Sequence, residues 1–167
     1  IVLGAAVGMV VSMLLWPRGA AATVQRAVDT ALTSAAAYLG AAVLRVTRGA
    51  SPQIDAELRV LGHDSQVDAR THGDAIRIYL AESNGAIDPG LLDTTNRIPR
   101  LRTAADLVAD IVPPAPGPYP QARKVLEEHT SALCARLDGS DPHRCTPEMS
   151  AQFVTALRAE AHGPDAA

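Results

Sequence analysis

Aromatic side chains are scarce in this chain of 167 residues: they make up 3% of it, although hydrophobic residues reach 47%. A core with so few large rings has to be built mainly from alanine, leucine and valine. The sequence also shows no internal repeat and no alternation of polar and apolar residues of the kind that predicts strands. We therefore expect an all-α protein.

Signatures of catalysis and of cofactor binding are missing as well. There is no phosphate-binding loop, no G-x-S-x-G, no H-E-x-x-H and no dinucleotide fingerprint. Four zinc-donor side chains fall within a short stretch: His129, Cys134, His143 and Cys145. Their spacing contains no C-x2-C pair and no helical i,i+4 pair, so we expect no metal site. We expect no catalytic residue, no cofactor and no enzyme.

Charge is absent from the first sixteen residues, Ile1 to Trp16 (IVLGAAVGMVVSMLLW), which end at Pro17-Arg18. A helix of this length measures roughly 24 Å, whereas a bilayer core is about 30 Å thick and needs about 20 apolar residues. We interpret residues 1–17 as the C-terminal part of a transmembrane helix whose remainder would precede Ile1. Trp16, Pro17 and Arg18 would lie at the membrane interface, where an indole is favoured.

This stretch has two alternative interpretations, a signal peptide and a buried helix. A signal peptide needs a positive segment before its apolar run and small residues at a cleavage site, and neither feature is present around Ile1–Pro17. A buried helix of a soluble domain is the stronger alternative, because apolar runs of 10–14 residues often have that role.

Small residues recur every four positions on one face of this stretch, at Gly4, Gly8 and Ser12. Such spacing lets the backbone of a neighbouring membrane helix approach closely. We therefore expect these residues to pack against the remaining transmembrane helices of a parent protein, within a lipid bilayer. Packing of the same residues against a second copy of the chain, in a homo-oligomer, is the other possibility.

Positive charge is concentrated near the apolar stretch. The first 50 residues contain four arginines and one acid, whereas the other 117 carry a net charge of −6. Arg18 and Arg26 follow the apolar stretch before Asp29, which by the positive-inside rule places this side in the cytoplasm. We expect a protein of the plasma (inner) membrane with a cytoplasmic C-terminal region. Without a concentrated basic patch, no nucleic acid is expected.

A membrane-proximal helical region is expected over residues 18–112. Apolar residues at helical spacing predict an amphipathic helix from Gly19 to Arg48, which packs on the bundle or at the membrane surface; a second span is the less favoured alternative. Ser51-Pro52 predicts the start of a second helix that ends at Asn84-Gly85. Residues 86–99 are expected to form a loop and residues 101–112 a shorter helix.

Proline then dominates residues 113–120, and we interpret this stretch as a stiff linker. Beyond it, residues 121–167 are expected to form a helical pair and a tail. The pair comprises a helix from Gln121 to Leu137 and a last helix that begins at Thr146-Pro147 and ends at His162-Gly163. The whole would be a cytoplasmic bundle of about five helices after the membrane segment.

One resemblance to a known family rests on residues 1–50. The run from Gly4 and Gly8 through Ser12 to Leu14-Leu15-Trp16-Pro17-Arg18, followed by an alanine-rich helix, resembles the fusaric-acid-resistance-like (FUSC) family of integral membrane proteins, also described as aromatic acid exporter-like. The resemblance implies that the chain is the C-terminal portion of an inner-membrane transporter that exports small aromatic acids or related compounds. It carries over no substrate-binding residue. The alternative is a single-pass, membrane-anchored helical scaffold or interaction protein without transport activity.

Overall fold

The computed structural model describes the backbone of residues 2–83, 89–112, 119–139 and 147–162, and the side chains of these residues except 2–20, 147–150 and 162. Within these ranges the chain forms five helices and no strand: α1 (Val2–Arg48), α2 (Pro52–Glu82), α3 (Pro89–Ala109), α4 (Pro120–Leu137) and α5 (Pro147–His162). The expected all-α class is confirmed.

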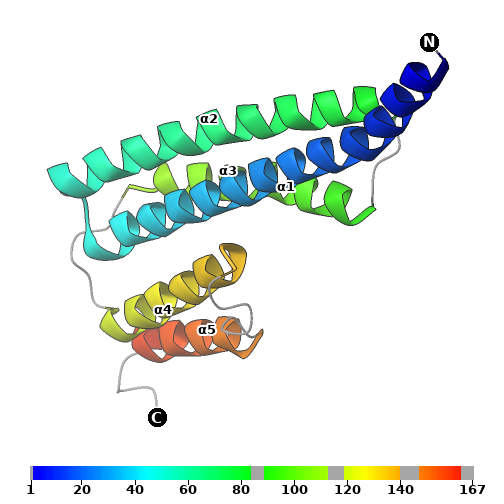
Figure 1. Cartoon of the computed structure of the whole chain (residues 1–167). Helices are drawn as coiled ribbons and strands as arrows, with labels where there is room; N and C mark the ends of the chain where they lie inside the picture. Colours follow the sequence, from blue (N-terminus) through cyan, green and yellow to red (C-terminus); the bar gives the residue numbers. More distant parts are fainter. Residues whose placement is uncertain (1, 84–88, 113–118, 140–146, 163–167) are drawn as a thin grey trace.

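Helix α1 is the central element of the fold. It packs against α2, α3 and α4, whereas α2 and α3 contact each other only slightly and α5 packs against α4. Figure 1 shows α2 and α3 lying along α1, with the α4–α5 pair beside the C-terminal half of α1. Every helix except α5 is therefore held in place through α1.

The contact between α1 and α2 has the spacing of an antiparallel coiled coil. Buried residues of α1 recur at alternating steps of four and three: Val24, Val28, Ala31, Ala35, Tyr38 and Ala42. The same steps on α2 connect Leu58, Gly62, Ser65, Ala69, His72, Ile76 and Tyr79. Such a seam keeps one face of each helix against its partner. Three of these α1 residues are alanines, which present little side-chain bulk to α2.

Two apolar clusters lie along α1. In the first, Val24, Val28 and Ala31 pack with Ile98 of α3, and Ile76 and Tyr79 of α2 join them. In the second, closer to the C-terminal end of α1, Tyr38, Leu39 and Val43 pack with Ala105 of α3 and with residues of α2 and α4. The core is thin and rich in alanine, as the composition predicts.

The turn between α1 and α2 follows the expected chemistry. Gly49 has a φ of +90°, a conformation that residues with a side chain rarely adopt. Ser51 then caps α2: its hydroxyl accepts a hydrogen bond from the backbone N–H of Ile54 at 3.2 Å, and Pro52 is the first helical residue. The predicted start of α2 is confirmed.

The N-terminal half of the chain differs from the expectation at Pro17. We expected one helix to end there and another to begin at Gly19, but the backbone is helical from Val2 to Arg48 without interruption. Proline fixes φ at about −65°, a value that a helix accepts. A helix of 47 residues is about 70 Å long.

The prediction of a loop at residues 86–99 is also wrong over most of its length, because α3 begins at Pro89. Pro99 lies inside this helix, where it can donate no backbone hydrogen bond. The helix persists because the preceding residue, Ile98, is buried in the core with 2% of its surface exposed.

The last two helices match their expected ranges closely, since α4 begins at Pro120 and α5 at Pro147. The predicted proline-rich linker falls mostly on residues 113–118, and the predicted tail on residues 163–167. Both lie outside the described residues.

Candidate functional site

The predicted membrane-facing residues lie in the N-terminal part of α1. Gly4, Gly8 and Ser12, and likewise Trp16, Pro17 and Arg18, have helical backbones, but their side chains lie outside the described part of the chain. Helix packing through the first three and interface anchoring by the last three therefore stay predictions.

One helix in the part of the chain searched is long and apolar enough to cross a membrane: the segment Ala21–Arg48 of α1. Half of its apolar window is buried inside the protein by the other helices. Its exposed positions are mostly polar and include Gln25, Arg26 and Asp29. A helix with a buried apolar face and a charged outer face is typical of a bundle in water. This segment is the core helix of the bundle.

The C-terminal end of α1 is held by Arg45, which joins α1 to α2 and α3. Its Nε donates to Asp55 of α2 at 2.8 Å, and its Nη1 donates to the carbonyls of Ala109 and Ile111 at 3.0 and 3.1 Å. These carbonyls lie at the C-terminal end of α3, where a cation is favoured by the helix dipole. Arg45 thus donates hydrogen bonds to carbonyl groups at the end of α3. This helix ends before the expected end at Val112.

A second polar network joins the end of α1 to α4. Glu127 accepts from Thr47 Oγ1 at 2.7 Å and from Arg48 Nη2 at 2.9 Å, while Arg123 donates to the carbonyl of Thr47 at 3.1 Å. The hydrogen bond from Arg48, opposed by partial burial and helped by Thr47, lowers the pKa of Glu127 below its usual 4.5. Arg45 and Arg48 therefore balance acids of the bundle. They lie about 40 Å or more along α1 from Arg18. The expected position of the positive charge beside a membrane stays a prediction.

A carboxylate of α5 caps the N-terminus of α4. Tyr119 provides no side-chain cap for α4, and instead both carboxylate oxygens of Glu160 accept from the backbone N–H groups of Gln121 and Ala122, at 2.7 and 3.0 Å. A negative group is favoured at this end of a helix. Glu160 lies 38 positions after Ala122 in the sequence, so helical spacing alone does not indicate this contact.

Tyr38 links α1 to both neighbouring helices. Its hydroxyl donates to Asp106 of α3 at 3.0 Å, and its ring covers Gly62 of α2 so closely that a Cβ there would lie 3.1 Å from Cε2. No local pattern in the sequence indicates a role for Gly62, because the ring that covers it belongs to Tyr38 on another helix.

Two buried polar residues interrupt the seam between α1 and α2. Ser65 is fully buried and His72 is 5% exposed, and neither Ser65 Oγ nor His72 Nε2 has a hydrogen-bond partner among the described residues. Burial lowers the pKa of His72 below 6.5. An unpaired polar group in an apolar seam destabilises it.

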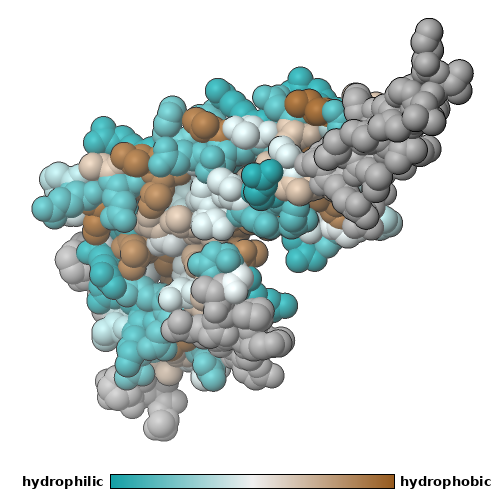
Figure 2. Space-filling model, viewed as in Figure 1, coloured by the Kyte–Doolittle hydropathy of each residue, from teal (hydrophilic) through white to brown (hydrophobic). Residues whose placement is uncertain are grey.

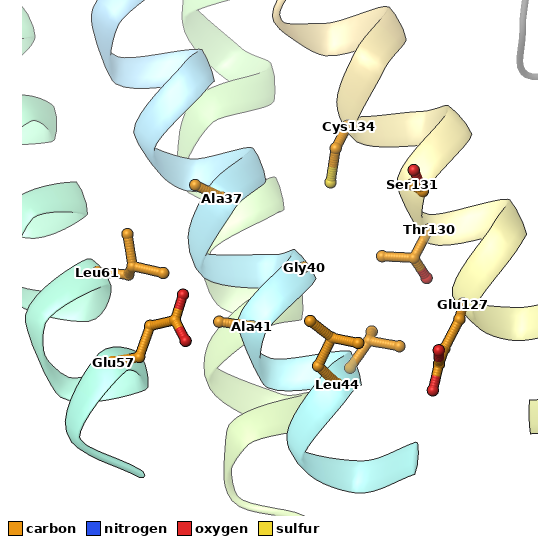
Figure 3. Close-up of a pocket in the computed structure, with 11 residues that line it drawn as sticks. Ala37, Gly40, Ala41, Leu44, Glu57, Leu61, Glu127, Thr130, Ser131 and Cys134 are labelled. Atoms are coloured by element: carbon orange, nitrogen blue, oxygen red, sulfur yellow. The ribbon is translucent and has the colours of Figure 1, made fainter. Parts of the chain in front are cut away.

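An open groove of about 410 Å³ lies between α1, α2 and α4. Figure 3 shows Ala37, Gly40 and Ala41 of α1 between Leu61 and Glu57 of α2 on one side and Cys134, Thr130 and Glu127 of α4 on the other. The groove exists because α4 packs on α1 without contacting α2. Its size is in the range of small-molecule sites.

Cys134 lines this groove from α4. Its thiol donates to the carbonyl of Ala36 at 3.2 Å, and burial raises the pKa of the thiol. A thiol of this kind is a poor nucleophile. No three metal-donor side chains come together among the described residues. Of the four zinc-donor side chains considered from the sequence, His143 and Cys145 lie outside that part.

Comparisons of this chain with protein-family models, with curated proteins and with solved structures find no match. The resemblance to the FUSC family therefore stays a prediction based on residues 1–50.

Proposed function

We propose that this chain is the membrane-anchored helical domain of an inner-membrane transporter of the FUSC type, with the bundle on the cytoplasmic side. In this proposal, the first part of α1 enters the bilayer and its continuation forms the core of the bundle. The substrate class, small aromatic acids or related compounds, comes from the resemblance in residues 1–50 alone.

The observation that supports the proposal most is the mismatch in length between α1 and its partners. The seam with α2 ends near Val24, which packs with Ile76 and Tyr79 close to the end of α2. The N-terminal part of α1 extends past that end in Figure 1. This extension contains the uncharged residues Val2–Trp16. The most apolar part of the chain is thus the part of α1 beyond the α2 seam.

Continuity of α1 gives the anchor a mechanical role. A helix that runs unbroken from Val2 to Arg48 holds the bundle close to the membrane and passes a tilt or rotation of the membrane segment to α2, α3 and α4. Arg45 and Arg48 fix the far end of this helix to its neighbours. A domain of this kind suits regulation or assembly of a transporter better than chemistry.

Orientation can be tested by thiol labelling. In a variant without Cys134 and Cys145, a cysteine at the exposed residue Ala50 should resist a membrane-impermeant maleimide in intact cells and react after permeabilisation. Efficient labelling of intact cells would contradict the cytoplasmic placement.

The alternative is a single-pass anchored interaction module. It is favoured by apolar residues on the outer face of α2, where Val60 and Ile78 are 60% and 59% exposed. The coding sequence before Ile1 separates the two proposals: several further hydrophobic spans support the transporter, and a start codon just before Ile1 supports the module. Loss of efflux of an aromatic acid on deleting the gene would support the transporter further.

A further inference from the structure

The groove between α1, α2 and α4 has an apolar floor made of small residues. Ala37, Gly40 and Ala41 lie on consecutive turns of α1, and Leu44 and Leu61 add apolar surface at the sides. Cys134 lies beside Gly40, since a Cβ placed on Gly40 would be in ordinary van der Waals contact with the sulfur at 3.6 Å. A flat apolar group, such as an aromatic ring, would be in contact with this floor.

The charges around the groove have a single sign. Two carboxylates, Glu57 and Glu127, line it, and no lysine, arginine or histidine does. Glu127 is already neutralised by Arg48. Glu57 is exposed and has no ion-pair partner among the described residues, so its charge is available to a ligand.

We propose that this groove binds small organic cations that carry an apolar ring, with the ring on the α1 floor and the ammonium group beside Glu57. The charge of the groove selects against aromatic acids, so this site is distinct from any site for the anionic compounds that the FUSC resemblance implies. The inference rests on the groove and holds whether or not the domain belongs to a transporter.

Three indoles with one ring system and different charges test the selectivity: tryptamine (+1), 3-methylindole (neutral) and indole-3-acetate (−1). Binding to the full chain in nanodiscs of zwitterionic lipid is measured by isothermal titration calorimetry, with empty nanodiscs as the blank. Tryptamine should bind at least about threefold more tightly than 3-methylindole, in line with one exposed ion pair, and indole-3-acetate should bind most weakly. Methyl resonances of Leu44 and Leu61 should shift with tryptamine.

Two variants and one matched control locate the site. Glu57→Gln should weaken tryptamine binding about threefold, to the level of 3-methylindole, and Ala37→Phe should abolish it by filling the groove from an exposed position. Glu82→Gln, an exposed acid on the same helix, should leave binding unchanged. The proposal is overturned if indole-3-acetate binds as tightly as tryptamine, if tryptamine does not bind, or if Glu57→Gln has no more effect than Glu82→Gln.

Discussion

The three-helix part of the molecule (α1, α2 and α3) and the α4–α5 pair are held together by different forces. Branched apolar side chains such as Val24, Val28 and Ile98 are fully buried in the three-helix part. The buried residues of α4 are Ala122, Thr130 and Ala132, which offer much less apolar surface. Since hydrophobic stabilisation scales with buried apolar area, α4 depends more on its polar contacts.

Figure 2 shows hydrophobic and hydrophilic residues intermixed on the visible face of α1 and α2, and mostly hydrophilic residues on the described part of α4 that faces the viewer. We conclude that α1, α2 and α3 form the stable frame. Helix α4 packs on it through the partly buried Leu126 and Leu133 and through charged contacts, and α5 caps the start of α4.

Removing apolar volume from the frame should have the largest effect. Ile98→Ala leaves a cavity in the first cluster and should lower the free energy of unfolding by about 2–5 kcal/mol. Val112→Ala, at a residue that is 84% exposed, should change it by less than about 0.5 kcal/mol. Urea unfolding of residues 19–167 followed by circular dichroism measures both, and equal effects would contradict the proposed frame.

Breaking the polar network should loosen α4 alone. Glu127→Gln weakens the contacts with Thr47 and Arg48 and should raise hydrogen exchange in α4 about tenfold, while exchange in α2 stays the same. Because the pKa of Glu127 is lowered in the folded protein, its contribution is complete above about pH 4.5 and is lost as the pH falls through the folded-state pKa. Exchange that rises equally in α2 and α4 would show that the two regions unfold as one.

The free energy of unfolding of the frame should depend on pH through His72. Because burial lowers the pKa of His72 below 6.5, the unfolded chain binds the proton more tightly, and stability should fall as the pH drops below about 6.5. His72→Leu should remove this slope and stabilise the seam by about 1 kcal/mol at pH 7, since it replaces an unpaired polar group. His72→Gln should remove the slope without the gain. Urea midpoints at pH 7.5 and 5.5 test this, and a slope that survives in both variants would exclude His72 as its source.

Two glycines of α2 should give the smallest difference. Nothing lies within 4 Å of a Cβ placed on Gly73, so Gly73→Ala should stabilise the helix by about 0.5–1 kcal/mol. At Gly62 the same gain is offset by contact with the ring of Tyr38, which Asp106 holds in place. Urea midpoints measure both effects. Equal stabilisation by both substitutions would mean that the ring of Tyr38 moves to make room for a methyl group at position 62.

Local signals predicted most of the helices correctly. Ser51-Pro52 and Thr146-Pro147 mark the starts of α2 and α5, and α4 begins one residue before the expected Gln121. The periodicity of α1 and α2 marks the faces that meet in the seam. These features depend on neighbouring residues only, so a sequence shows them. Pro99 misled the same reasoning, because the burial of Ile98 outweighs the cost of a proline inside α3.

The contacts that complete the bundle could not be predicted. Arg45 meets carbonyls of Ala109 and Ile111, and Glu160 meets the start of α4, across separations of 38 to 66 residues. The groove beside Glu57 likewise exists only because α4 and α2 diverge around α1. Periodicity identifies which face of a helix is apolar, but it does not say which helix covers that face.

The membrane anchor is tested most directly by membrane partition of the full chain compared with residues 19–167. We expect the full chain to float with liposomes and to resist extraction with carbonate. Residues 19–167 should remain in solution as a helical monomer by sedimentation and circular dichroism, because the bundle from Val24 onward is complete without the anchor. A full chain that is soluble and monomeric without detergent or lipid would contradict the membrane anchor and make the first part of α1 a covered element of a soluble protein.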